Sequence, residues 1–187
     1  GLLGPDGPSR ALLGQHAFSD FQAFQLWGGQ AFAGDFPATP PPYLPMSYAY
    51  GALYFGFAPW AAVLIHQGLT IAVTCAAALL LLRGLPLARR IVIVLLTTVA
   101  TLPMVATLDT GNIQGLTLAL LICSVAALQR GYVTIAWLIL GLAISFKGYP
   151  ALLLIWPLAI GAWRFALKAA LAALIANGLF FVILPGG

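Results

Sequence analysis

The sequence predicts an all-α protein, built as a polytopic transmembrane helix bundle of about six spans plus one short re-entrant or interfacial helix. Of its 187 residues, 62% are hydrophobic and 6% are charged, whereas soluble domains carry about 25% charged residues. So few charges cannot form the polar surface that a soluble protein of this size needs. Lipid is therefore the expected solvent for most side chains, and a soluble all-apolar domain is the less favoured alternative.

The first 42 residues are more polar than the rest, being rich in Gly, Pro and Gln and holding three of the four aspartates. Aromatic residues recur there at three-residue intervals: Phe18, Phe21, Phe24 and Trp27. This stripe predicts a short interfacial helix over 17–30, and the prolines at 40–42 end any helix. We interpret 1–42 as an extracytoplasmic loop with an interfacial helix, and 43–187 as the transmembrane helical bundle.

Seven apolar segments follow the loop. Residues 43–57 are too few to cross the bilayer simply and predict a short or re-entrant segment. The six expected spans are 59–82, 90–108, 113–128, 132–146, 150–163 and 167–184. Several are shorter than roughly 20 residues, so polar flanks or local thinning of the bilayer must complete them. The chain begins at Gly1 and ends directly after an apolar run, so we expect a fragment with further spans on both sides.

The basic residues predict which way the spans run. If the spans alternate, six of the eight basic residues fall on one side, and the positive-inside rule makes that side cytoplasmic: Arg83, Arg89, Arg90, Arg130, Arg164 and Lys168. All four aspartates then face the other side, together with Arg10 and Lys147. The net charge of +4 is scattered between apolar runs, which favours membrane topology over a nucleic-acid partner.

Asp20, in Ser19-Asp20-Phe21, is the candidate catalytic residue on the outer face. It stands among apolar and amide residues with no basic neighbour in sequence. A partly desolvated aspartate is a competent general base. The alternative is a solvated loop carboxylate without a chemical role.

Two further polar clusters are expected on the same face, at 108–114 and 145–150. The first opens a helix that Asp109 or Thr110 can cap, and free N–H groups at such a start favour an anion such as phosphate. The second contains Lys147, the single lysine on this face, which can hold a lipid phosphate at the membrane boundary. The alternatives are a helix cap alone and a snorkelling lysine that stabilises its helix end.

Other chemistry has no support in the sequence. There is no phosphate-binding glycine loop, no zinc-ligand spacing and no Gly-x-Ser-x-Gly element, so we expect neither a metal nor a cofactor. Cys75 and Cys123 lie inside apolar runs, which is typical of packing residues. His66 lies inside a span, where we expect a hydrogen bond to a neighbouring helix.

The ordered motifs resemble the polytopic GT-C glycosyltransferases, and specifically glycosyltransferase family 87, the bacterial mannosyltransferase-like group. Three elements carry the resemblance over nearly the whole chain: Asp20-Phe21 with Ala33-Gly34-Asp35 after an aromatic helix, Pro41-Pro42, and Gly111-Asn112-Ile113-Gln114 followed one span later by Phe146-Lys147-Gly148-Tyr149-Pro150. These are similar to the family's Asp-Phe, Tyr-Pro-Pro, Gly-Gln-x-Asn and Lys-x-x-Pro elements. Pro40 replaces the family's Tyr, and Asn112 and Gln114 exchange the two amide types.

The resemblance implies a membrane hexosyltransferase in the bacterial inner membrane with an extracytoplasmic active face. It would move a mannose-like sugar from a polyprenyl-phosphate carrier to a glycan or glycolipid acceptor, with inversion. Asp20 would be the base, and the implied substrate-binding residues are Asp109, Asn112, Gln114, Lys147 and Tyr149. The lipid-linked sugar is a substrate rather than a cofactor. The alternatives are a non-catalytic transporter or flippase of lipid-linked sugars, and a structural membrane subunit.

Overall fold

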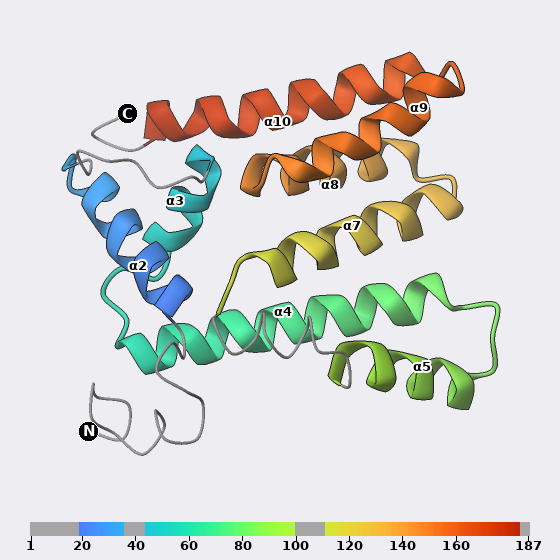
Figure 1. Ribbon diagram of the computed structural model, residues 1–187, viewed down its shortest axis with the longest axis horizontal. Coiled ribbons are helices and arrows are strands. Elements are labelled where there is room, and N and C mark those ends of the chain that lie inside the picture. Colours follow the sequence, from blue (N-terminus) through green and yellow to red (C-terminus); the bar gives the residue numbers. More distant parts are fainter. Residues whose placement is uncertain (1–18, 36–43, 100–110, 184–187) are drawn as a thin grey trace.

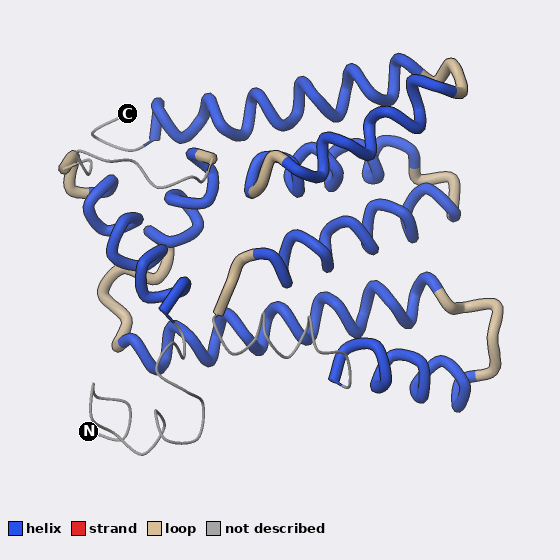
Figure 2. The backbone as a smooth tube through the Cα atoms, viewed as in Figure 1, coloured by secondary structure: helices blue, strands red, loops and turns tan. Residues whose placement is uncertain are grey.

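The computed structural model describes residues 19–35, 44–99 and 111–183, and every regular element in these ranges is a helix (Figures 1 and 2). The all-α prediction is therefore confirmed. The elements are α2 (Ser19–Phe32), α3 (Pro45–Ala52), α4 (Pro59–Leu81), α5 (Leu87–Val99), α7 (Gln114–Gln129), α8 (Val133–Phe146), the 3-10 helix η1 (Tyr149–Leu154), α9 (Ile155–Ala159) and α10 (Trp163–Ile183).

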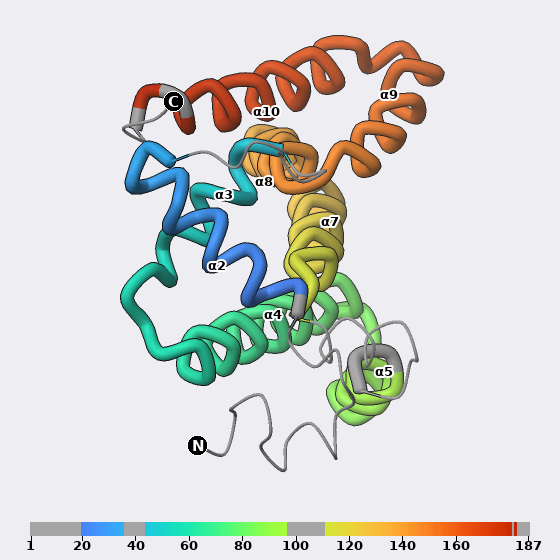
Figure 3. Tube along the Cα trace, turned by 60° about the vertical axis from the view of Figure 1, so that its left-hand side comes forward, coloured from blue at the N-terminus to red at the C-terminus, as the bar shows by residue number. Residues whose placement is uncertain are grey.

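Four helices form the body of the bundle and run roughly along its long axis (Figure 1). Helix α4 packs against α7, α7 against α8, and α8 against α10, while α5 lies beside α4. The short helices α2 and α3 pack against each other and close one end of the bundle. Figure 3, turned so that this end comes forward, shows α2 lying across it between α3 and α4.

The outer surface and the helix contacts have the composition expected in lipid. Large apolar side chains point outward, with Val182 80% exposed and Leu174 68% exposed, whereas Ala119 and Ala136 are fully buried. Small residues at helix contacts allow the close approach that drives association where no hydrophobic effect operates. Within the residues that the structure describes, two helices are long and apolar enough to cross a membrane, Pro59–Leu81 and Trp163–Phe180.

Six spans are not all observed. The shorter apolar helices are Gln114–Gln129, Val133–Phe146 and Tyr149–Ala159. The expected span over 150–163 is divided into η1 and α9, because Pro157 lacks the N–H that a continuous α-helix would use and its ring crowds the preceding turn. The chain then turns at Gly161, which has φ +78°. The expected span over 150–163 is therefore observed as a shorter apolar helical segment, Tyr149–Ala159.

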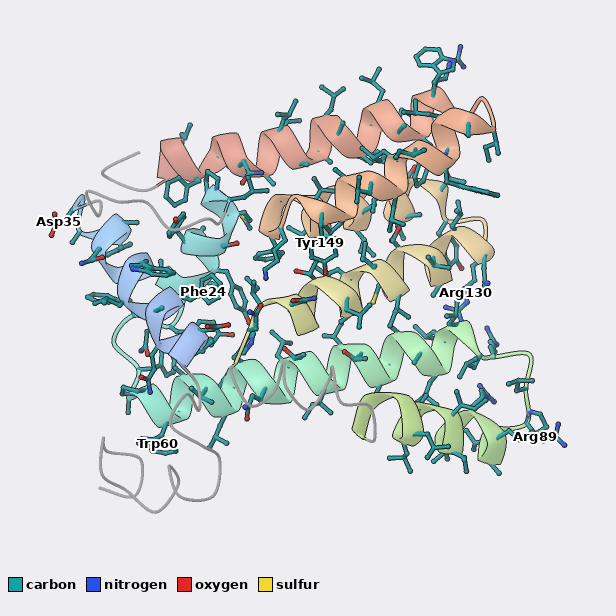
Figure 4. The ribbon with its side chains drawn as sticks, viewed as in Figure 1. Phe24, Asp35, Trp60, Arg89, Arg130 and Tyr149 are labelled. Atoms are coloured by element: carbon teal, nitrogen blue, oxygen red, sulfur yellow. The ribbon has the colours of Figure 1, made fainter. Side chains whose placement is uncertain are left out.

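The bundle has two chemically different ends. The turns at 82–86, 130–132 and 160–162 meet at the end away from α2 and α3 (Figure 1). Figure 4 shows Arg89 and Arg130 at that end, and Asp35 and Trp60 at the other. Arg130 there donates from Nη2 to the carbonyl oxygen of Leu80 at 2.9 Å. Arg89 and Arg130, which the charge pattern assigns to one side, therefore lie at the same end of the bundle.

Candidate functional site at the α2 end of the bundle

Helix α2 packs closely against the bundle core and against α3. On its apolar face, Phe21 and Phe24 are each 1% exposed in the main hydrophobic cluster. A Cβ added to Gly28 would lie 2.2 Å from the backbone nitrogen of Ala52, and one added to Gly51 would lie 2.1 Å from the carbonyl oxygen of Phe24. The backbones of α2 and α3 are therefore in direct contact, which leaves α2 little freedom to shift.

The turn before α7 packs against the first turn of α2. Gly111 has φ +65°, and a Cβ at this position would lie 2.7 Å from the Cβ of Phe21. Glycine is favoured here for two reasons, because it adopts positive φ without strain and leaves room for Phe21. Ile113, 1% exposed, anchors the other side of the turn in the same cluster as Phe21. Asn112 between them is brought against Asp20.

Asn112 bridges a carboxylate and an ammonium group. Its Nδ2 donates to Oδ2 of Asp20 at 2.6 Å, and its Oδ1 accepts from Nζ of Lys147 at 3.1 Å. Oδ1 also accepts from the backbone N–H of Gln114 at 2.9 Å. An ionised carboxylate only accepts and an ammonium only donates. The amide therefore has one favourable orientation, which the two charged neighbours fix.

Lys147 is directed toward Asn112 by the end of α8. It follows Phe146 in extended conformation, with φ −142° and ψ 141°, and Ser47 Oγ of α3 donates to the carbonyl oxygen of Phe146 at 2.7 Å. Lys147 is half-buried, and burial lowers its pKa while the negative charge of Asp20 acts in the opposite direction. An ammonium in this position has lost part of its water shell.

The structure brings three of the six sequence-predicted residues together: Asp20, Asn112 and Lys147. Gln114 contributes its backbone N–H while its side chain is exposed. Tyr149 begins η1 and is 43% exposed, and within the described residues no hydrogen bond joins it to the cluster. Burial raises the pKa of its hydroxyl. Asp109 lies outside the described residues.

The cap of α7 differs from the expectation. We expected Asp109 or Thr110 to cap this helix, but α7 begins at Gln114 and the carbonyl oxygen of the Asn112 side chain takes its first N–H. Gly111, which has a positive φ, directly precedes Asn112. Both expected residues lie outside the described part of the chain.

Two cavities of the described residues lie apart from this cluster. One of about 630 Å³ runs along the face of α2 lined by Gln22, Gln30 and Phe55. The other, about 580 Å³, is an apolar groove between α8 and α10. Neither is lined by Asp20, Asn112 or Lys147, so the three residues form a hydrogen-bonded cluster at the end of the bundle rather than the wall of either cavity.

Sequence reasoning did not single out two residues that hold this end together. Ser47 fixes the end of α8, as described above. Asn177 of α10 accepts from the backbone N–H of Met46 at 3.1 Å through Oδ1. Each is a polar residue inside an apolar segment, which is the signal that could have identified them, since such residues in membrane helices commonly bond to a neighbouring helix.

The fold and the cluster define an apolar helical membrane protein that gathers a carboxylate, an amide and a cation at one end. The family model for glycosyltransferase family 87 matches residues 40–187. The chain belongs to this family and is therefore a membrane glycosyltransferase. Asn112 and Lys147 lie within the matched range, and Asp20 precedes it. No curated protein and no solved structure matches the chain.

Proposed function

We propose that the protein transfers a mannose-like sugar from a polyprenyl phosphate to a glycan or glycolipid acceptor at the outer face of the bacterial inner membrane. The observation that carries this proposal is the contact chain from Asp20 through Asn112 to Lys147, with distances of 2.6 Å and 3.1 Å. A glycosyl transfer from a lipid phosphate needs a base for the acceptor and a cation for the leaving phosphate. The cluster supplies one of each.

Asp20 acts as the general base in this proposal. Its carboxylate accepts the proton of the acceptor hydroxyl as the hydroxyl oxygen attacks the anomeric carbon. The bond from that carbon to the phosphate oxygen breaks on the opposite face, and the phosphate leaves with the bonding electrons. One bond forms and one breaks at the same carbon, so the anomeric configuration inverts. The amide N–H of Asn112 orients the carboxylate for this step.

Lys147 and the start of α7 bind the phosphate in this proposal. Negative charge increases on the phosphate as the sugar departs, and a desolvated ammonium stabilises that charge more strongly than an exposed one. Asn112 separates Lys147 from Asp20 by one amide group. The base and the cation can therefore act on opposite sides of one sugar carbon without neutralising each other directly.

The charge pattern supports the outer face as the site of transfer. The first turn of α2 and the start of α7, which carry Asp20 and Asn112, lie toward the end of the bundle opposite to Arg89 and Arg130 (Figures 1 and 4), and the positive-inside rule assigns such arginines to the cytoplasm. Polyprenyl-phosphate sugars can reach a site at the membrane boundary by lateral diffusion. This position also favours transfer over transport, because transporters place their polar groups near the midplane.

The decisive experiment compares two aspartate variants of the full-length protein in membranes, supplied with labelled polyprenyl-phosphate mannose and acceptor. Asp20→Asn should lower transfer about 10²- to 10⁴-fold, the usual contribution of a general base. Asp35→Asn removes an exposed carboxylate just after the same helix and should leave transfer unchanged.

Unchanged transfer by Asp20→Asn would remove it as the base. The configuration of the product provides a second check, since a retained anomer contradicts a single displacement. Polyprenyl-phosphate glucose in a parallel assay tests the choice of sugar. Movement of the labelled lipid between leaflets without transfer to an acceptor would favour a flippase instead.

A further inference from the structure

A buried chain of hydrogen bonds lies directly beneath the site. The hydroxyls of Tyr54 and Tyr50 are 2.8 Å apart, and the Tyr50 hydroxyl is 2.8 Å from Nδ1 of His66. These residues come from the segment after α3, from α3 and from α4, and they are 6%, 7% and 2% exposed. The proposed transfer reaction uses none of the three.

The imidazole of His66 touches both halves of the site. The ring stacks on Phe21, the residue after Asp20, with centroids 4.7 Å apart and planes inclined by 25°. The ring also lies close to the backbone at Gly111 and Asn112. Phe21 and Gly111 are themselves in close contact. One buried side chain therefore contacts the start of α2 and the turn that carries Asn112.

Every group in this chain of hydrogen bonds can both donate and accept. Either tyrosine hydroxyl can be the donor in the bond between Tyr50 and Tyr54. The tautomer of His66 decides whether Nδ1 donates to the Tyr50 hydroxyl or accepts from it. Each of these polar groups has a partner, and an unpartnered buried group would cost about 1–3 kcal/mol.

We propose that His66 is a positioning residue for the transferase site. This inference rests on the proposed function of Asp20. His66 fixes the backbone of the Gly111–Asn112 turn against α2, so that the Asn112 amide stays within bonding distance of both Asp20 and Lys147. The alternative is a histidine that only fills the core. Its removal would lower the stability of the whole bundle without acting through Asn112.

The test is a double-mutant cycle on the full-length protein in membranes. His66→Phe keeps a ring against Phe21 but loses the hydrogen bond to Tyr50 and the polar ring nitrogens beside the turn, and should lower kcat about 10- to 100-fold, because small misplacements of reacting groups have effects of this size. His66→Gln keeps a donor near the turn and should recover part of the loss. Thr74→Val removes a buried hydroxyl from the same helix, whose partner is Thr70 of that helix, and should match the unmodified protein.

The decisive comparison is made in an Asn112→Ala background. If His66 acts through Asn112, His66→Phe causes no further loss there, since the residue it positions is gone. The positioning role would be overturned if the fold-loss of the double variant equalled the product of the two single losses. Full activity of His66→Phe would overturn it as well. If His66→Phe fails to fold, Tyr50→Phe removes the partner of Nδ1 and should show the same non-multiplying loss. Activity retained by Asp20→Asn overturns the proposed function itself, so the two failures are distinguishable.

Discussion

At the scale of single residues, Asn112 has the most partners in the site. Its amide is a neutral group that donates to the carboxylate through Nδ2 and accepts from the ammonium through Oδ1. An aspartate at this position would repel Asp20, and an alanine would leave Asp20 and Lys147 without their shared bridge. The exchange of Asn and Gln relative to the family's motif therefore preserves the chemistry while changing the reach of the side chain.

The protonation state of Lys147 predicts how the rate of transfer depends on pH. Burial lowers the pKa of Lys147, with Asp20 opposing, so the ammonium loses its proton at a lower pH than a solvated lysine does. If its charge stabilises the leaving phosphate, transfer should fall on the alkaline side as Lys147 deprotonates. A guanidinium stays charged throughout this range, so Lys147→Arg should retain activity to higher pH.

The measurement for Lys147 is the pH dependence of kcat for the unmodified protein, Lys147→Arg and Lys147→Ala. Lys147→Ala should be about 10²-fold slower at neutral pH, a typical loss for one charged group that stabilises a transition state. An alkaline fall at the same pH in the unmodified protein and Lys147→Arg would show that another group controls it.

Replacing Gly111 should lower both the stability of the protein and its activity. Gly111→Ala combines positive φ with a clash against Phe21, and we expect a loss of about 2–4 kcal/mol of stability. Gly131 is the matched control, because it has φ +77° but nothing within 4 Å of an added Cβ. Gly131→Ala should cost only the backbone strain, about 1 kcal/mol. Thermal unfolding in detergent measures both, and equal losses would contradict the Phe21 contact.

At the scale of elements, α2 and α3 pack as one unit through backbone contact. Gly28→Ala places a methyl group 2.2 Å from the backbone of α3, so the two helices must separate, and we expect a loss of about 2–4 kcal/mol with reduced transfer. Gly68→Ala, in α4 with open space around it, should instead stabilise its helix by roughly 0.5–1 kcal/mol. Similar unfolding temperatures for the two variants would show that α2 and α3 are not in backbone contact.

The helix boundaries show what can be predicted from the spacing of apolar residues and from prolines at helix ends. The expected helix over 17–30 is observed as Ser19–Phe32, and the expected span over 59–82 as Pro59–Leu81, with proline in its first turn. The aromatic stripe and the proline are local signals, so the sequence is sufficient for both. The change from η1 to α9 between Leu154 and Ile155 was not predicted, because an apolar run does not show where the missing N–H of Pro157 interrupts α-helical hydrogen bonding.

At the scale of the whole molecule, the two ends of the bundle should lie in different compartments. In a variant without Cys75 and Cys123, Asp35→Cys should react with a membrane-impermeant maleimide in intact cells. Arg89→Cys should react only after the membrane is opened, because Figure 4 shows it at the opposite end. Labelling of both positions in intact cells would contradict the predicted topology and the outer-face reaction with it.

The sequence by itself determined the solvent, the secondary structure and the separation of charges. The composition indicates lipid as the solvent, the apolar runs predict helices, and the positions of the arginines predict the two ends of the bundle. All three predictions depend on residue type and on short-range order along the chain. The tertiary structure alone decided that Asn112 bridges Asp20 and Lys147, residues 92 and 35 positions away in sequence. It also decided that His66 lies beneath them. Such contacts depend on the angles and separations of packed helices, which close approaches like those at Gly28 and Gly111 set to within a few tenths of an ångström.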